Sequence, residues 1–286
     1  AEHHNMPAVA SSAPDVLIAH VAQQTRRIRV GAGGVMLPNH APLVVAERFG
    51  MLEAFHPGRI DLGIGRAPGT DQRTARALRR AADTIHGEAF LQQLAELEAF
   101  MADDVPADHP MADIRAVPGG TVPPIWLLGS SGFSAQVAAL TSRPFSFAYH
   151  FAPGGLHEAL RLYRERFVPS DDLPEPHVML GVNVVCAPTD EEAQFLAGSG
   201  RLVKRWLRRG DLRPVPTPER ARDELGAPDP SRPTTSVVGS PDTVRAGLVD
   251  LVERTGVQEL TVAGTFHDAG AQARSLELVA GATGLA

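Results

Sequence analysis

Short apolar segments punctuated by glycine alternate with amphipathic, alanine-rich segments along most of this chain. The apolar segments lack the polar–apolar alternation of half-exposed strands, which is typical of parallel strands covered on both faces. They span residues 28–37, 59–65, 124–129, 145–151, 178–187 and 259–264. Because helical patterns lie between them, the sequence predicts at least six β/α units in an α/β fold with right-handed crossovers.

Proline and serine residues mark where several of the expected helices begin. Pro14 lies in the first turn of one helical pattern, and Ser11 or Ser12 is the expected N-cap. A second helix is expected to begin at Pro42, and a third covers 88–102.

Six strands are too few to close a (β/α)8 barrel, which needs eight. We therefore expect one barrel domain over residues 1–286 in which two strands are unaccounted for, and their expected place is before residue 1. Long insertions are expected near 66–123 and 210–235, the second as a mobile lid.

The composition excludes several classes of protein. With 43% hydrophobic residues and a net charge of −6, the chain is typical of a globular protein with no basic surface for nucleic acid or anionic lipid. No run of 18 apolar residues is present, so no membrane contact is expected. Cys186 is the only cysteine, which excludes an internal disulfide and fits a cytoplasmic protein. It lies in an apolar run and is expected to be an inert core thiol.

Polar residues follow the predicted strands. They include Glu2 to Asn5, Asn39 and His40, Arg66, the turn 129–132, and Tyr149 and His150. Active sites of (β/α)8 barrels lie where strands end and loops begin, so the sequence predicts a site at this edge.

The segment "LLGSSGFSAQ" runs from a strand through a Gly-Ser-Ser-Gly turn directly into a helix. Free backbone N–H groups and two hydroxyls at a helix start suit a phosphate, and an ordinary serine-capped helix fits equally well. A G-x-S-x-G nucleophile turn is excluded because residue 133 is phenylalanine.

The glycine-rich segment "DLGIGRAPGTD" is not a dinucleotide-binding motif, because its spacing is one residue too long and Pro68 stands where the helix should begin. Arg66 is interpreted as a phosphate clamp, with a surface ion pair to Asp71 as the alternative. Gly33 and Gly34, inside a predicted strand, indicate either the close approach of a flat ring or a tight bend.

His3 and His4 are adjacent, so on a strand their side chains would point to opposite faces. They are not expected to share a metal ion, and no metal site is predicted. One of them facing the site as a proton or hydrogen-bond donor is the sharper hypothesis.

Three segments together resemble the bacterial luciferase-like flavin-dependent monooxygenases, most closely the non-luminescent single-chain branch. They are "AEHHNMPAVASSAP", "VGAGGVMLPNHAPLVVAERFGMLEAFHPGRIDLGIGRAPGTD" and "WLLGSSGFSAQ". The resemblance implies a (β/α)8 barrel with insertions that binds FMN or, in one branch, the deazaflavin F420. In that family a strand, a helix and a second strand precede the "EHH" motif, so the resemblance also implies a chain that lacks the first strand, the first helix and most of the second strand.

The resemblance also implies roles for individual residues. His3 matches the catalytic histidine that lies near the reacting carbon of the flavin. Gly33 and Gly34 match the family's cis peptide beneath the isoalloxazine, with Val35 beside them. The phosphate site is matched by Arg66, Gly129, Ser130, Ser131 and Gly132. Gly65 stands where the luminescent enzymes carry a reactive cysteine, so luminescence is not implied.

The expected activity is that of a flavin-dependent monooxygenase, an oxidoreductase that uses reduced FMN and O2 on a small, hydrophobic substrate. Met36, Tyr149 and Phe151 are the expected pocket residues. An F420-dependent reductase or dehydrogenase and an inactive flavin-binding paralogue are the alternatives. Expected partners are a separate flavin reductase, because no NAD fingerprint is present, and a second copy in a full-length homodimer.

Overall fold

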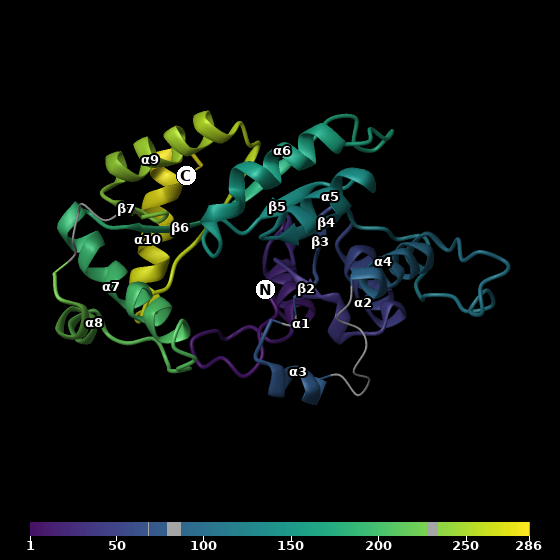
Figure 1. Cartoon of the computed structure of the whole chain (residues 1–286), viewed down its shortest axis with the longest axis horizontal. Coiled ribbons are helices and arrows are strands. Elements are labelled where there is room, and N and C mark those ends of the chain that lie inside the picture. The colour runs from purple at the N-terminus through teal and green to yellow at the C-terminus, as the bar shows by residue number, and fades with distance from the viewer. Residues whose placement is uncertain (68, 79–86, 228–233, 286) are drawn as a thin grey trace. The chain divides into compact units, whose positions relative to one another are not determined.

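The computed structural model describes residues 1–286 except 68, 79–86, 228–233 and 286 (Figure 1). Parts of the expected insertions at 66–123 and 210–235 therefore lie outside the described residues. The chain folds as two compact units, Ala1–Gly129 and Ser130–Ala286. Each is described by itself.

The described residues of the first unit form four parallel strands: β1 (Val30–Gly31), β2 (Val35–Met36), β3 (Ile60–Gly65) and β4 (Ile125–Gly129). Strand β3 is central and pairs with the other three. The single strand expected at 28–37 is wrong. Two short strands form instead, because the chain leaves the ladder at residues 32–34, where the Gly33–Gly34 peptide bond is cis.

In the part of this unit that the structure describes, these strands are accompanied by α1 (Pro14–Gln24), the 3-10 turn η1 (Leu37–Asn39), α2 (Pro42–Phe55), α3 (Gln72–Leu78) and α4 (Gly87–Ala102). The expected starts at Pro14 and Pro42 are confirmed. The expected serine cap of α1 is wrong, since Pro14 at the first helical position makes Ala13 the N-cap. The Ser11 hydroxyl instead donates to the carbonyl of Ala1.

The second unit is built around β6 (Val178–Cys186), which pairs in parallel with β5 (Phe145–Phe147), β7 (Val237–Gly239) and β8 (Glu259–Ala263). Eight of the nine residues of β6 are apolar or glycine, which is typical of a strand covered on both faces. Strand β7 has three residues, too few to produce a periodic pattern in the sequence.

The helical segments of the second unit are α5 (Gly132–Leu140), the 3-10 turn η2 (Pro153–Gly155), α6 (Leu156–Arg166), α7 (Asp190–Leu207), α8 (Pro218–Leu225), α9 (Pro241–Thr255) and α10 (Ala269–Thr283). Helix α8 lies in the segment expected to be a lid. It packs against α7, where Ala221 joins the buried pair Leu202 and Trp206. The alternation of parallel strands and helices in both units confirms the predicted α/β class.

Cys186 ends β6 and is buried, and its amide donates to the Ser275 hydroxyl over 2.9 Å. Burial raises the pKa of its thiol, so the prediction of an unreactive core thiol is supported. Across the described residues, no helix combines the length and apolar character needed to cross a membrane.

Candidate functional site

Glycines let the chain around the cis peptide lie directly on β3. A Cβ on Gly63 would come within 2.0 Å of the Ala32 carbonyl oxygen, and a Cβ on Gly34 within 2.6 Å of the Gly63 carbonyl oxygen. Gly33 differs, because a Cβ there would meet no atom within 4 Å. Gly34 and Gly63 are therefore packing requirements, whereas Gly33 leaves exposed backbone against open space, as a flat ring would need.

Glu2 lies beside this backbone, with its side chain fully buried. Its Oε1 accepts hydrogen bonds from His4 Nε2 (3.0 Å) and Asn39 Nδ2 (2.9 Å). Its Oε2 accepts from the Met36 amide (2.8 Å) and from His40 Nε2 (2.9 Å). These four bonds fill the acceptor positions of the carboxylate.

Burial alone would raise the pKa of Glu2. The hydrogen bonds from His40, Asn39, His4 and Met36 outweigh it and lower the pKa to about 2. The carboxylate is therefore ionised at neutral pH, and the histidine nitrogens that face it must donate. Sequence reasoning missed this role, although an acid beside "HH" and a distant "NH" pair at 39–40 were visible signals.

His3 follows Glu2, and its ring is fixed by a backbone carbonyl. Its Nδ1 lies 3.1 Å from the Gly69 carbonyl oxygen, which can only accept a hydrogen bond. Nδ1 therefore carries the hydrogen, and Nε2 of the neutral ring has an available lone pair. In the neutral ring, Nε2 is therefore the nitrogen that can accept a proton or a hydrogen bond, and the catalytic role of His3 stays a prediction.

A hollow of about 400 Å³ adjoins His3, within the size range of small-molecule sites. It is lined by residues 3–12 of the loop before α1: His3, Asn5, Met6, Pro7, Val9, Ala10 and Ser12. The lining combines a polar end at His3 and Asn5 with the apolar side chains of Met6, Pro7 and Val9.

The loop after β3 holds the His3 segment in place. Gly69 has φ +66°, and a Cβ there would lie 2.4 Å from the Glu2 carbonyl oxygen, so only glycine fits. Thr70 donates from Oγ1 to the His4 carbonyl (2.6 Å). The Asn5 amide donates to Thr74 Oγ1 (3.1 Å). The glycine and threonines of "PGTDQRT" therefore serve to position residues 2–5.

Asp71 begins α3 and accepts hydrogen bonds from the Arg73 amide and from both the amide and the hydroxyl of Thr74. The bonds from Thr74 lower the pKa of Asp71 to about 2. These contacts make Asp71 the capping residue of α3. The capping hydrogen bonds account for the lowered pKa of Asp71, and the ion pair to Arg66 that the sequence offered as an alternative is not required for it.

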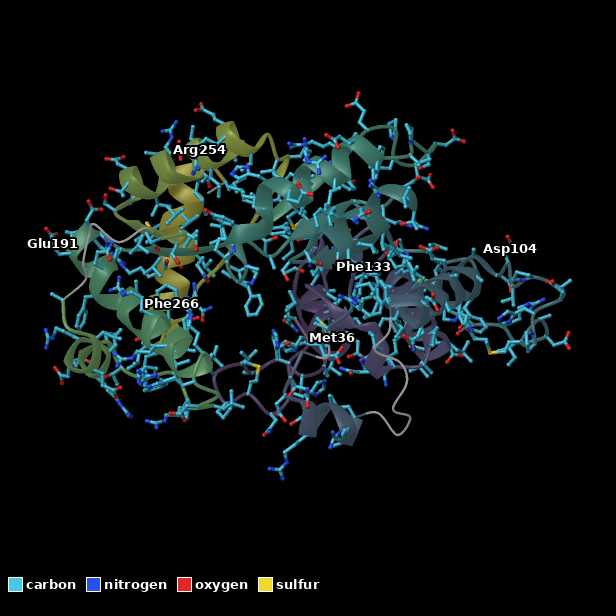
Figure 2. The ribbon with its side chains drawn as sticks, in the orientation of Figure 1. Met36, Asp104, Phe133, Glu191, Arg254 and Phe266 are labelled. Atoms are coloured by element: carbon cyan, nitrogen blue, oxygen red, sulfur yellow. The ribbon has the colours of Figure 1, made fainter. Side chains whose placement is uncertain are left out.

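Arg66 directly follows β3, and its side chain is half-buried. The preceding Gly65 faces Met36 (labelled in Figure 2), whose Cε would lie 2.9 Å from a Cβ at position 65. Met36 therefore fills the space that a cysteine side chain would occupy at position 65. The phosphate-binding role of Arg66 remains a prediction.

The Gly-Ser-Ser-Gly turn ends β4 and begins the second unit. Ser131 is the exposed N-cap residue of α5, but its side chain makes no capping hydrogen bond. A Cβ on Gly132 would meet Leu162 Cδ1 at 2.8 Å. The interpretation as an ordinary serine-capped helix is therefore wrong in detail, because the Ser131 hydroxyl is not used as a cap.

His150, in the second unit, is tied to β6. Its amide donates to the Gly181 carbonyl (2.7 Å), and its Nδ1 lies 3.1 Å from the same oxygen. Asn183 donates to the His150 carbonyl (3.2 Å). Of the expected pocket residues nearby, Tyr149 is half-buried, whereas Phe151 is 78% exposed. The second unit alone therefore does not bury Phe151 in a pocket.

The first unit brings several predicted site residues together through its backbone. The Glu2 amide donates to the Gly34 carbonyl (3.0 Å), which places His3 one residue away from that contact. Val35 is buried and pairs with Ile64 of β3. Ser130, Ser131 and Gly132 belong to the second unit. Within the described parts of the chain, no group of three or more acidic, histidine or cysteine residues is arranged to hold a metal ion.

Comparison with known sequences gives a consistent result. The family model described as luciferase-like monooxygenase matches residues 1–259. YvbT of Bacillus subtilis (strain 168) is 47% identical over 286 residues, 98% of this chain and 84% of YvbT. A luciferase-like monooxygenase of Escherichia coli (strain K12) is 43% identical over 97% of this chain and 83% of its own length. N-acetyl-S-alkylcysteine monooxygenase of B. subtilis is 36% identical over 93% of this chain and 78% of its own length.

Solved structures with the same fold include apo-MsnO8, with a TM-score of 0.89 at 38% identity, covering 100% of this chain and 86% of that one. The oxygenating constituent of 3,6-diketocamphane monooxygenase from Pseudomonas putida, in complex with FMN, has a TM-score of 0.68 at 22% identity, covering 97% and 85%. An F420-dependent secondary alcohol dehydrogenase has a TM-score of 0.67 at 12% identity, covering 98% and 88%. The last two similarities show the fold alone.

Proposed function

The chain belongs to the luciferase-like monooxygenase family, and we propose that it uses reduced FMN and O2 to oxygenate a small, hydrophobic organic substrate. Family membership confirms the resemblance, the luciferase-like α/β fold and the assignment to the oxidoreductases. Two observations together carry the proposal: the backbone at Gly33 is exposed, and the imidazole of His3 is oriented by the Gly69 carbonyl. The two residues are connected because Glu2, which precedes His3, donates from its amide to the carbonyl of Gly34, which follows Gly33.

The residues present fit a flavin. The open space at Gly33 suits an isoalloxazine ring lying on the backbone, with Gly34 and Val35 completing that surface. Arg66 and the turn 129–132 would hold the phosphate, through a guanidinium and through backbone N–H groups at the start of α5. Once bound and reduced, the flavin supplies the reaction with O2, which no protein side chain performs.

The contribution of the chain is to orient groups and to manage a proton. His3 Nδ1 is anchored on the Gly69 carbonyl, so Nε2 is the atom that accepts a proton or a hydrogen bond during the reaction. The apolar residues Met6, Pro7 and Val9 line the hollow beside it and favour a substrate with a hydrophobic part. Substrate binding there would also displace water from around Nε2.

The choice between FMN and F420 is testable with the purified chain. We expect the fluorescence of the protein to be quenched when FMN binds. We expect O2 uptake to require reduced FMN together with a substrate from a panel that includes an N-acetyl-S-alkylcysteine. His3→Gln, as a matched variant, is expected to bind FMN but to slow O2 consumption. F420 binding with anaerobic hydride transfer to or from an alcohol would support the reductase alternative. No O2 uptake with any reduced flavin would refute the monooxygenase proposal.

Exposed apolar side chains on α1 and α2 support a homodimer. Val16 is 65% exposed on α1, and Met51 and Phe55 are 48% and 70% exposed on α2. A helix that is apolar on its outer face as well as its inner one normally packs against a partner. We propose that a second copy covers this face. Light scattering of the wild type and of Phe55→Glu tests the dimer.

We also propose that the protein acts in the cytoplasm and that a separate reductase supplies its reduced flavin.

A further inference from the structure

One buried charge in the first unit has no direct part in the proposed reaction. Of the acidic and basic side chains that the structure describes, Glu2 alone is fully buried. An ionised carboxylate is costly to bury, and its four hydrogen bonds compensate for that cost. Since all its acceptor positions are occupied, the carboxylate is not available to bind a ligand or to transfer a proton.

The carboxylate joins the N-terminal segment to the end of β2 and to the η1 turn that follows it. Met36 is the last residue of β2, Asn39 ends η1 and His40 is the C-cap of η1. The fourth partner, His4, lies within the N-terminal segment itself, so the carboxylate also fixes that segment internally. Residues 1–5 are thereby attached to the turn by side-chain bonds.

The main chain of Glu2 makes two further contacts, one on either side of the proposed site. Its amide donates to the Gly34 carbonyl, and its own carbonyl lies against Gly69. The same Gly69 provides the carbonyl that accepts from His3 Nδ1. Displacement of Glu2 would therefore move His3 relative to both Gly34 and Gly69.

We propose that Glu2 is a positioning residue, whose buried carboxylate holds His3 on the Gly69 carbonyl so that Nε2 is presented to the reactants. The presence of reactants at Nε2 rests on the proposed function. The link from Glu2 to the imidazole tautomer does not, because it is a property of the free protein. In water, the neutral imidazole of histidine prefers its hydrogen on Nε2, so loss of the Gly69 bond changes the tautomer.

Long-range ¹H–¹⁵N NMR of ¹⁵N-histidine-labelled protein, at a pH where the ring is neutral, reports which nitrogen carries the hydrogen. The His3 signals are assigned by their absence in His3→Gln. We expect the Nδ1–H form in the wild type and a shift toward Nε2–H in Glu2→Gln. Glu158→Gln is the matched control, because Glu158 is exposed on α6 in the second unit and pairs with Arg161. It is expected to leave the His3 signals unchanged.

A kinetic measurement separates positioning from simple structural support. We expect Glu2→Gln to lower kcat for O2 uptake by about 10–100-fold with little change in KM, the effect of a misplaced reacting group. If Glu2→Gln does not fold, Asn39→Ala combined with His40→Ala removes two of the four donors and keeps the charge of Glu2, and the same tautomer shift is expected. A wild-type His3 tautomer in the folded variant would overturn the proposal. Absence of O2 uptake in the wild type would refute the proposed function and leave the tautomer result intact.

Discussion

Two glycine-rich strand ends, residues 31–34 and 129–132, look alike in the sequence and are used differently in the structure. In the first, Gly34 lies against the Gly63 carbonyl, and the Glu2 amide bonds to the Gly34 carbonyl. In the second, Gly132 faces only the end of the Leu162 side chain, and the Ser131 hydroxyl makes no capping bond. The first segment is held by backbone atoms on both sides. The second is bordered at Gly132 by a side chain that can move, and its Ser131 hydroxyl is not used in a capping hydrogen bond.

A glycine near a proposed ligand site is therefore not by itself a ligand-binding glycine. Gly34 and Gly63 are required by the packing of backbone on backbone, while a Cβ on Gly33, one residue away from Gly34, would meet no atom of the described residues within 4 Å. A substitution series can separate these two reasons for glycine, because one alters the stability of the protein and the other its affinity for the flavin.

The largest effect is expected at Gly63. In Gly63→Ala the new Cβ would lie 2.0 Å from the Ala32 carbonyl oxygen, a backbone atom that cannot rotate away. We expect a loss of at least about 3 kcal/mol in the free energy of unfolding, or failure to fold. Urea denaturation followed by circular dichroism measures it.

Gly33→Ala is the matched control for that substitution. Its Cβ would meet no atom within 4 Å, so the free energy of unfolding should change by less than about 1 kcal/mol. The FMN dissociation constant should instead rise about tenfold or more, since the methyl group would separate the ring from the backbone. Equal stability losses in both variants would contradict the distinction between the two glycines.

The next largest effect concerns Glu2 and depends on pH. Its pKa is about 2 in the folded protein against an ordinary value of 4.5, so the ionised carboxylate contributes on the order of 3 kcal/mol at neutral pH. Because the folded-state pKa is the lower one, this contribution is complete above about pH 5 and is lost as the pH falls toward about 2.

Urea unfolding of the wild type and of Glu2→Gln between pH 7 and pH 2 tests this dependence. The stability difference between the two proteins should be largest at neutral pH and should shrink below about pH 4.5, the ordinary pKa. The stability of Glu158→Gln, which alters an exposed ion pair, should follow the same pH dependence as that of the wild type. A pH-independent difference for Glu2→Gln would indicate that lost packing, not lost charge, causes it.

The parts of the fold that the sequence predicted are those specified by local signals. Buried apolar runs predicted β3 and β4, and Pro42 together with the His-Pro-Gly segment after Phe55 bounded α2. The helix expected at 88–102 is α4, which begins one residue earlier. Each of these elements is determined by residues within itself or next to it.

The parts that the sequence did not reveal depend on contacts between distant residues. Strand β7 has three residues and is defined by its pairing with β6, and α8 is defined by its packing on α7. Glu2 is the clearest case, because its partners at 36–40 lie more than thirty positions away, as does the Gly69 carbonyl that fixes His3. The sequence located the histidine, but only the fold shows which of its nitrogens is available.

A smaller effect is expected at Gly132, the counterpart of Gly34 in the second segment. In Gly132→Ala the Cβ would meet Leu162 Cδ1 at 2.8 Å, but this is the far end of a side chain that can rotate. Alanine also favours the helical conformation at the start of α5. We expect the free energy of unfolding to change by less than about 1 kcal/mol. In a Leu162→Ala background, Gly132→Ala should cause no loss in the free energy of unfolding. If Gly132→Ala in the wild-type background lowers it as much as Gly63→Ala does, the distinction between the two segments is wrong.

The smallest effect on stability is expected at Ser131, where the proposed function makes the variant most informative. Because its hydroxyl does not cap α5, Ser131→Ala should change the free energy of unfolding by less than about 0.5 kcal/mol. The matched variant Thr189→Ala removes a hydroxyl that accepts from the Glu192 amide at the start of α7, and should cost about 1 kcal/mol. If the Ser131 hydroxyl instead donates to a phosphate, Ser131→Ala should weaken FMN binding about tenfold and leave riboflavin, which has no phosphate, unaffected. Parallel titrations of the two flavins therefore decide whether the second segment is a phosphate site, and equal losses for both would exclude it.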